Sequence, residues 1–443
     1  MLGRLARPLL FLIVVLLLIL GGIWLVTRQG NASLPVTAVE GQRPTIAAPD
    51  IEQIPTIAIA TPVPWGNARP APAKGLKVQA FADGLDHPRW LYTLPNGDVL
   101  VAEANSPPRK ANSLTDRVMG WLLGRAGAGV PSANRITLLR DANGDGVAET
   151  RSVLISGLNS PTGMALVGGT LYVANTNAVL AFPYKPGDTR ITARPEKIVN
   201  LPGGGNHWAR NLLASPDGRL LYVTVGSASN IGERGMDKEE RRAAIWEVYP
   251  ENKTFRIYAA GLRNPNGLAW EPHRHELWTV VNERDMLGGD SPPDYLTFVD
   301  FGGFYGWPYS YWGGYVDRRT ESRPDLLEYT RRPDYALGPH TAPLGLVFAE
   351  GAKLGRQFAN GAFVALHGSW NRKPLSGYKV IYVPFGDDGM PAKGVKPIDV
   401  LAGFLDGDKH TRGRPAGLAL DKTGALLVAD DVGNRIWRVS AAE

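Results

Sequence analysis

The chain has 443 residues, of which 44% are apolar, so it is long enough for one large fold or for more than one domain. It contains 52 glycines and 35 prolines, a composition that favours many turns over long helices. Cysteine is absent, which excludes disulfides and thiolate metal sites, and the net charge of +6 includes no basic block, which argues against a nucleic-acid partner.

An uncharged apolar run occupies residues 9–26 near the N-terminus. A run of this length can cross a hydrocarbon core of about 30 Å. Arg4 and Arg7 precede it, and the positive-inside rule then places the N-terminus in the cytoplasm. A cleaved signal peptide is the alternative, but the run is longer than a usual signal core and no small-residue cleavage site closes it. We expect residues 1–28 to be a single-pass inner-membrane anchor, with the rest of the protein on the periplasmic side.

Residues 29–74 are rich in proline, alanine and threonine. This composition is typical of an extended linker. We therefore expect a spacer over residues 29–74 and a folded domain over residues 75–443.

Six segments share one pattern: a polar turn, a short apolar strand, a glycine-containing turn and a second apolar strand. Six related hairpins predict an all-β fold, a six-bladed β-propeller of four-stranded antiparallel blades. A pair of β-sandwiches is the alternative, but it does not explain six copies of one hairpin. The hairpins span residues 87–103, 160–175, 207–225, 263–282, 340–367 and 412–430.

The turn that leads into each hairpin carries polar side chains. Because the innermost strands of a propeller line its channel, these turns are expected to meet at one mouth of the channel. Histidine, arginine and asparagine gathered at one opening predict a site for an anionic or carbonyl-rich ligand. The alternative is that these groups only bond to neighbouring loops. The residues are His87, Thr162, Asn206, His207, Arg263, Asn264, His340, Thr341, Arg412 and Arg414.

Two acidic loops are candidate cation sites. Residues 282–294, after the fourth hairpin, offer the carboxylate and carbonyl oxygens that Ca²⁺ prefers. Residues 141–146 have the D-x-N-x-D-G start of a calcium loop, but its twelfth position is Ser152 in place of glutamate. An insertion over residues 104–134 contains an apolar cluster that is expected to form a short helix.

Four motifs taken together resemble a known family, the quinoprotein sugar dehydrogenases of the soluble glucose dehydrogenase and sorbosone dehydrogenase type. They are residues 261–270, the Phe-Tyr-Gly-Trp-Pro run at 304–308, the Asn206-His207 turn with Arg210, and the pair Arg412 and Arg414. The similarity runs from about residue 75 to residue 439. It implies a six-bladed propeller that binds pyrroloquinoline quinone (PQQ) over the channel mouth, with Ca²⁺ beneath it.

The resemblance also implies roles for individual residues. Arg412 and Arg414 would pair with the carboxylates of PQQ. Arg263 and Asn264 would bond near the quinone oxygens, and Arg263 would thereby assist catalysis. His207 would accept the proton of the substrate hydroxyl while hydride moves to the quinone.

Other implied positions depart from the family pattern or are matched less directly. Ca²⁺ would be held by the backbone carbonyl oxygens of Glu283 and Arg284. Ser227 stands where the soluble glucose enzymes have an aspartate that orients the catalytic histidine. Arg372 is our substitute for a lysine of the fifth blade. The remaining implied cofactor-binding residues are Thr162 and His340.

The expected function is a membrane-anchored, PQQ- and Ca²⁺-dependent dehydrogenase of the glucose or sorbosone type. It would oxidise an aldose or sugar aldehyde and pass electrons to a quinone or a cytochrome. A calcium-dependent lactonase is one alternative, although three arginines at the mouth suit an anionic cofactor better. A non-catalytic propeller that binds a sugar or a protein is the other.

Overall fold

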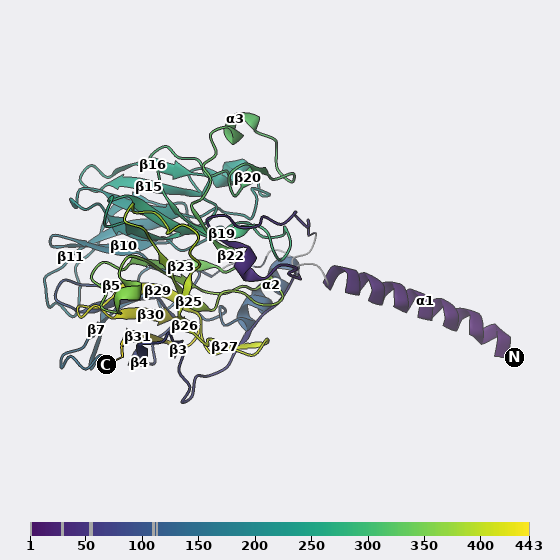
Figure 1. The fold of residues 1–443 in the computed structure, drawn as a ribbon, viewed down its shortest axis with the longest axis horizontal. Helices are drawn as coiled ribbons and strands as arrows, with labels where there is room; N and C mark the ends of the chain where they lie inside the picture. Colours follow the sequence, from purple (N-terminus) through teal and green to yellow (C-terminus); the bar gives the residue numbers. More distant parts are fainter. Residues whose placement is uncertain (1, 28–30, 53–55, 109–110, 112–113, 443) are drawn as a thin grey trace.

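The computed structural model describes residues 2–27, 31–52, 56–108, 111 and 114–442. Strands dominate the chain from residue 76 onward, and helices are few (Figure 1). The helices are α1 (Leu2–Thr27), α2 (Leu114–Arg125) and α3 (Pro324–Leu327). Helix α2 lies in the insertion where a short helix was expected. The all-β class predicted from the sequence is confirmed.

Within the described residues, six antiparallel sheets each contain four strands from the centre outward. The two inner strands of each sheet are one of the six predicted hairpins. The first two sheets are β5 (Pro88–Thr93), β6 (Val99–Glu103), β7 (Arg135–Arg140) and β8 (Thr150–Ile155), then β9 (Met164–Val167), β10 (Thr170–Asn175), β11 (Ala178–Pro183) and β12 (Glu196–Asn200). The next two are β13 (Leu212–Ala214), β14 (Leu221–Val225), β15 (Ala244–Tyr249) and β16 (Thr254–Ala260), then β17 (Pro265–Trp270), β18 (Leu277–Val281), β19 (Pro293–Phe298) and β22 (Tyr335–Pro339). The last two are β23 (Pro343–Phe348), β24 (Gly361–Leu366), β25 (Lys379–Pro384) and β26 (Ile398–Ala402), then β29 (Pro415–Leu420), β30 (Leu426–Asp430), β31 (Arg435–Ala441) and β4 (Leu76–Ala82).

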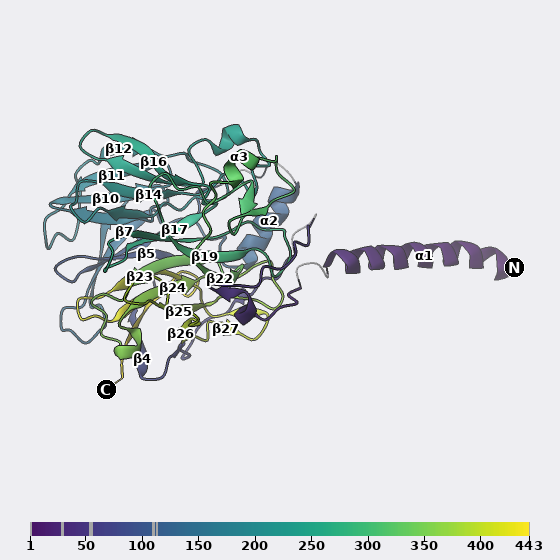
Figure 2. The ribbon, with the colours of Figure 1, turned by 45° about the horizontal axis from the view of Figure 1, so that its top comes forward.

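The inner strands form a closed ring, which is the arrangement of a β-propeller. In order around the ring, β5 contacts β9, β9 contacts β13, β13 contacts β17, β17 contacts β23, β23 contacts β29 and β29 contacts β5. The ring is closed by β4, which pairs with β31 and so joins the start of the domain to its end. Figure 2 shows two opposite sheets, with β12, β11 and β10 following one another inward on one side and β26, β25, β24 and β23 on the other.

Glycine in the inner strands permits this close approach of neighbouring sheets. A Cβ added at Gly163 would lie 2.6 Å from the Cβ of Leu212 in the next inner strand. One added at Gly417 would lie 2.8 Å from the Cα of Trp90. The Gly that recurs near the start of these hairpins is therefore a packing requirement of the ring. The second strands, such as β6, are buried along their whole length because a sheet covers each face.

Helix α1 contains the apolar run 9–26 and extends away from the sheets (Figure 1). The prediction of a membrane anchor is contradicted: of the helices in the described ranges, none combines the length and the apolar character that a membrane crossing requires. The same finding contradicts the single-pass inner-membrane location that was predicted from this run.

The sequence predicted that the proline-rich segment is a spacer, but the segment makes contacts with the folded domain. Its short strands β1 (Glu40–Gly41), β2 (Thr61–Pro62) and β3 (Ala71–Pro72) pair with β22, with β28 (His410–Thr411) and with β26. Trp65 is 3% exposed, and its indole Nε1 donates to Asp430 Oδ2 at 2.8 Å. Residues 53–55 lie outside the described part of this segment. Proline suits these positions because each strand is a short edge addition.

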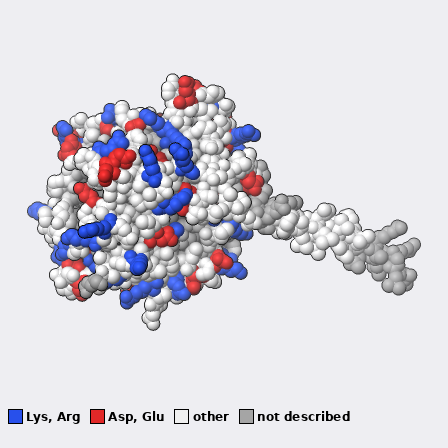
Figure 3. Space-filling view, viewed as in Figure 1, with Lys and Arg blue, Asp and Glu red and all other residues white. Residues whose placement is uncertain are grey.

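The remaining short strands belong to connections between the sheets. β20 (Ser310–Tyr311) and β21 (Tyr315–Val316) pair in the long connection from β19 to β22, which also contains α3. β27 (Leu405–Asp406) pairs with β28 ahead of the last inner strand. On the face drawn in Figure 3, basic side chains are spread out with acidic groups between them.

Candidate functional site

The polar turns do meet at one end of the ring. In each antiparallel hairpin, the start of the first strand and the end of the second lie at the same edge, so the residues before β13 and after β14 face those before β17 and after β18. The turn with His207 precedes β13, Ser227 follows β14, and Arg263 precedes β17. The backbone N–H of Ser227 donates to the carbonyl of Arg263 at 2.8 Å, which joins the two sheets at this mouth.

His207 is half-buried, and the backbone fixes its tautomer. Its Nδ1 lies 2.8 Å from the carbonyl oxygen of Ser227 and 3.0 Å from the Ser227 hydroxyl, which itself donates to the carbonyl of Ser229. Both oxygens are acceptors, so Nδ1 carries the proton and Nε2 is left as an acceptor. Burial, reinforced by the guanidinium of Arg263, lowers the pKa of His207 to about 3. The serine in place of the family aspartate therefore still orients the ring, through its backbone.

Gly226 lets Asn264 and His207 approach the end of β14. A Cβ at this position would meet Asn264 Oδ1 and would lie 2.6 Å from the Cβ of His207. No side chain can be accommodated there without moving both residues.

Replacing Gly226 by alanine should therefore lower turnover and ligand binding at the mouth by about tenfold or more, the cost of moving a reacting group by a fraction of an ångström to about 1 Å. Steady-state kinetics and ligand titration measure the effect, and circular dichroism checks the fold. Gly314→Ala is the matched control, because a Cβ at Gly314 meets no atom within 4 Å. Equal kinetics for both variants would contradict the close packing described here.

Arg263 is 4% exposed and is held by a cage of protein acceptors. Its Nε and Nη2 donate to the carbonyl (3.1 Å) and side-chain oxygen (2.9 Å) of Asn230. Nη2 also pairs with Asp285 at 2.9 Å, and Nη1 donates to the carbonyl oxygens of Glu283 (2.6 Å) and Asn282 (3.4 Å). Every N–H of the guanidinium is thus engaged. Arg263 contributes a fixed charge to the mouth, whereas the resemblance implied free donors.

Asp285 links this cage to two further loops. Asn371 Nδ2 donates to its Oδ1 at 2.9 Å, and His340 Nδ1 lies 3.8 Å from the same oxygen. Although burial opposes ionisation of the carboxyl, Arg263 and His340 hold the pKa of Asp285 well below its usual range. Burial also disfavours the charged imidazole, but Asp285 raises the pKa of His340 above its ordinary value. His340 is therefore placed at the mouth as predicted, bound to Asp285 and, through Nε2, to the carbonyl of Gly288 at 2.9 Å.

Two of the predicted cofactor residues serve the protein framework instead. Thr162 is 2% exposed, and its hydroxyl donates to the carbonyl of Arg210 and accepts from the Arg210 N–H. Arg372 is 1% exposed and donates to the carbonyls of Gly289 (2.8 Å) and Pro374 (2.9 Å). Its Nη2 lies 3.3 Å from Asp290. Both side chains have their partners in the fold, which leaves them poorly suited to hold a ligand.

Arg412 and Arg414 do not act as a pair. Arg412 is bonded to Asp406 at 2.9 Å, so for this residue the alternative of a bond to a neighbouring loop holds. Arg414 is 5% exposed, its guanidinium lies 4.7 Å from the ring centre of Tyr378, and Nη1 reaches the carbonyl of Gly368 at 3.3 Å. Within the described part of the chain, its Nε and Nη2 have no hydrogen-bond partner. The two arginines diverge because residues 412–414 turn between β28 and β29 and are not a strand.

A second cluster, centred on Asp431, was not predicted from the sequence. Asp431 follows β30, is fully buried, and forms an ion pair with Arg89 from β5. His367 Nε2, after β24, lies 2.8 Å from its carboxylate, and His87 Nε2 lies 3.5 Å away. Burial alone would raise the pKa of the Asp431 carboxyl. The neighbouring His367, His87 and Arg89 outweigh this effect and hold that pKa far below its usual range. The guanidinium of Arg89 also lies 5.8 Å from the ring centre of Trp208, so this cluster borders the turn with His207.

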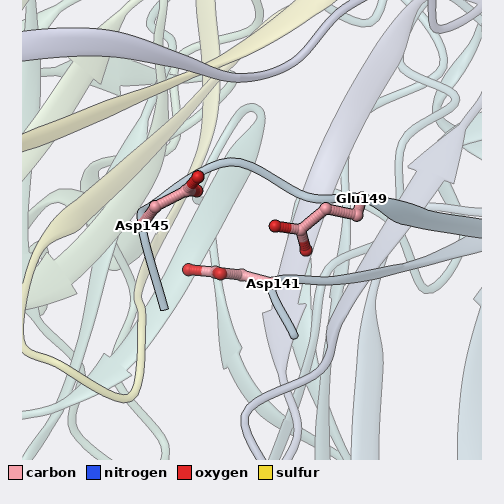
Figure 4. Close-up of side chains that lie close together, drawn as sticks. All are labelled: Asp141, Asp145 and Glu149. Atoms are coloured by element: carbon pink, nitrogen blue, oxygen red, sulfur yellow. The ribbon is translucent and has the colours of Figure 1, made fainter. Parts of the chain in front are cut away.

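Two other features lie away from the mouth. Asp141, Asp145 and Glu149 gather at the tip of the β7–β8 hairpin, with carboxylate oxygens within 4.8 Å of one another (Figure 4). Since β6 ends at the mouth and β7 runs back, this tip lies at the opposite end of the sheet. Asp141 already accepts the N–H groups of Gly144 and Gly146. A cavity of about 730 Å³ lies beside β8 and the loop 189–195, and it includes none of the predicted site residues.

The geometry thus defines a β-propeller whose channel mouth carries an oriented neutral histidine, a caged arginine and a buried arginine with free donors. Comparison with known proteins agrees with this class. A family described as TrAA12-like matches residues 127–292 and 324–442, more than half of the chain. The chain belongs to the TrAA12-like family. Its relatives include PQQ-dependent sugar dehydrogenases, the family that its sequence motifs resemble.

The relatives differ in how much of their length is matched. The chain is 23% identical over 359 residues to a PQQ-dependent pyranose dehydrogenase of Coprinopsis cinerea, and this match covers 70% of this chain and 44% of that enzyme. It is 26% identical over 424 residues to a PQQ-dependent sugar dehydrogenase of Hypocrea jecorina, covering 83% of this chain and 88% of that enzyme. A protein of Borreliella burgdorferi is 30% identical over 242 residues, covering 53% of this chain and 60% of that protein. The chain therefore spans less than two thirds of the first and third of these relatives.

Among solved structures, the holo PQQ domain of the Coprinopsis cinerea pyranose dehydrogenase superposes with a TM-score of 0.65 at 21% identity. The superposition covers 84% of this chain and 97% of that domain. It supports the same all-β propeller fold.

Proposed function

We propose that this protein is a PQQ-dependent dehydrogenase that oxidises an aldose or a sugar aldehyde at the channel mouth of a six-bladed propeller, the six sheets being its blades. The observation that carries this proposal is Arg414. A buried guanidinium whose Nε and Nη2 have no hydrogen-bond partner within the described chain is costly unless an anion completes its bonds. PQQ has three carboxylates and fits this donor set.

His207 supplies the base for the reaction. With Nδ1–H held by Ser227, its Nε2 can take the proton of the substrate hydroxyl. The lowered pKa keeps the ring unprotonated at neutral pH, so Nε2 presents a lone pair, and a bound anionic cofactor would raise this pKa and strengthen the base. When bound, PQQ would supply the acceptor of the hydride, and a quinone or a cytochrome would receive the electrons afterwards.

Arg263 and Asn264 complete the proposed mouth. Arg263 adds a fixed positive charge that favours electron density moving onto a bound quinone. Asn264 is half-buried, and the hydrogen bond that its side chain donates to Asn282 is long, at 3.5 Å, so its amide is available to a ligand. The lactonase alternative requires carboxylates free to bind a metal, but Asp285 and Asp431 each hold an arginine.

The direct experiment is reconstitution. The full chain is mixed with PQQ in millimolar CaCl₂, so that any need for calcium is met, and reduction of an artificial dye is followed with a panel of aldoses and sugar aldehydes. Dye reduction that depends on both PQQ and sugar supports the proposal, and its absence with every substrate of the panel contradicts it.

Arg414→Gln should weaken PQQ binding by about tenfold to a hundredfold, because it removes charge-assisted hydrogen bonds of about 1.5–3 kcal/mol each. Arg412→Gln is the matched control and should change the affinity by less than about threefold, because its exposed ion pair with Asp406 contributes at most about 1 kcal/mol. Fluorescence titration of both variants with PQQ measures the difference. Equal losses would show that the two arginines act together after all.

A further inference from the structure

We propose that this chain binds PQQ without a divalent cation, and that the guanidinium of Arg263 occupies the place that the family resemblance reserves for Ca²⁺. The inference rests on the proposed function and concerns the same mouth. It follows from the arginine side chains that already bond to the carbonyl oxygens of Asn282, Glu283 and Asp285.

The first carbonyl expected to bind Ca²⁺ is that of Glu283. It accepts the shortest hydrogen bond of Arg263, 2.6 Å from Nη1, and the carbonyl of the preceding Asn282 is 3.4 Å from the same nitrogen. Calcium requires six to eight oxygen ligands at about 2.3–2.6 Å. An ion at that distance from the Glu283 oxygen would share it with a guanidinium group already in contact.

The second expected ligand is the carbonyl oxygen of Arg284, and the guanidinium of the same residue folds back onto this loop. Arg284 donates through Nε (3.1 Å) and Nη2 (3.0 Å) to the carbonyl of Asp285, and its Nη1 forms a buried ion pair with Asp317. Both arginines are nearly inaccessible to solvent, at 4% and 2% exposure. The loop is therefore neutralised by two fixed organic cations.

The carboxylates that could attract a metal are also committed. Asp285 is paired with Arg263, and Asp317 is paired with Arg284. The Glu283 carboxyl is 4% exposed, and its Oε1 accepts the backbone N–H of Arg284 at 2.9 Å. A dication here would meet two guanidinium groups whose carboxylate partners, Asp285 and Asp317, are already engaged.

The cage around Arg263 explains how a guanidinium can take this place. Asn230 accepts from Arg263 through two oxygens, and its side chain also bonds the backbone N–H (2.9 Å) and carbonyl (3.0 Å) of Asp285. The indole Nε1 of Trp307 donates to the Asn230 carbonyl at 2.9 Å. Arg263 is consequently fixed in position, as a bound metal would be, and its charge acts on the quinone through space.

The test compares PQQ affinity in two buffers. The full chain is dialysed against excess EDTA and titrated with PQQ by calorimetry, in EDTA and again in millimolar CaCl₂. We expect dissociation constants that agree within about threefold. Binding that appears only with CaCl₂, or tightens by about tenfold or more, overturns the inference but leaves the proposed function intact. Failure to bind PQQ in either buffer refutes the proposed function itself.

A variant pair and a direct metal titration make the test independent of activity. Arg263→Gln in EDTA should lose at least about tenfold in PQQ affinity, with a circular dichroism spectrum like that of the wild type, and unchanged affinity would overturn the inference. Calcium titrated into the apo chain without PQQ should give no signal from the mouth. Asp141→Asn with Asp145→Asn is the control for calcium bound at the remote hairpin tip. Calcium binding by the apo chain that persists in this double variant would place a calcium site away from the hairpin tip, and it would overturn the inference.

Discussion

Replacing His207 by glutamine should lower turnover by about 10²-fold or more, while PQQ affinity stays within about tenfold. The reason is the tautomer that Ser227 imposes: Nδ1–H is bound to a carbonyl, and Nε2 is the free basic atom. Glutamine can occupy similar space and can donate to the same carbonyl, but its amide cannot accept a proton. Steady-state rates at saturating PQQ separate the loss of chemistry from the loss of cofactor.

The control is His275→Gln, an exposed histidine in the turn between β17 and β18. It should keep the rate of the wild type. If His207→Gln also turned over normally, the base would have to be sought elsewhere at the mouth, and His367 would be the first candidate because its ring is oriented by Asp431.

The hairpins could be predicted because their signals are local. Each one combines an apolar strand, a turn with glycine and a second apolar strand within a short stretch, as in residues 160–175. The polar turns could then be assigned to one mouth from the topology alone. His207 and Arg263 were found in this way, and the structure places them close enough for Arg263 to lower the pKa of the histidine.

The partners of those side chains could not be predicted, because they come from distant parts of the chain. Alternation along an extended strand would have put Arg412 and Arg414 on one face, but the turn after β28 sends Arg412 to Asp406. The cluster at Asp431 needs β5, β24 and β30 side by side, which only the closed ring provides. A weak signal existed, since His87, His367 and Asp431 each stand at the mouth end of an inner hairpin.

The N-terminal region shows a different limit. The composition of residues 29–74 predicted a spacer. In the structure, β1, β2 and β3 each pair with a strand at a sheet edge, and the side chain of Trp65 is buried in the core. Short additions of this kind have no periodicity to detect, because two paired residues do not make a pattern.

Asp431→Asn should destabilise the protein by about 3–5 kcal/mol at neutral pH, the usual cost of removing one partner of a buried ion pair. Arg89 would keep its charge with only an amide opposite it, and His367 would lose the carboxylate 2.8 Å from Nε2. Denaturant unfolding of variant and wild type measures the loss. Asp406→Asn is the matched control, because its pair with Arg412 is solvent-exposed and should cost no more than about 1 kcal/mol.

The pH dependence gives the same prediction a second readout. In the folded protein the pKa of Asp431 lies far below its ordinary value of 3.8. The carboxylate therefore contributes its full share of stability above pH 3.8, and this share is lost progressively as the pH falls from 3.8 toward the folded pKa. The difference in stability between wild type and Asp431→Asn should therefore be constant near neutrality and should shrink below about pH 4. His87 and His367 have lowered pKa values in the folded state, so both proteins should lose stability as the pH falls below 6.5. A difference that is absent at neutral pH would mean that the Asp431 cluster does not hold the three sheets together, and that Arg89 is neutralised by another group at the mouth.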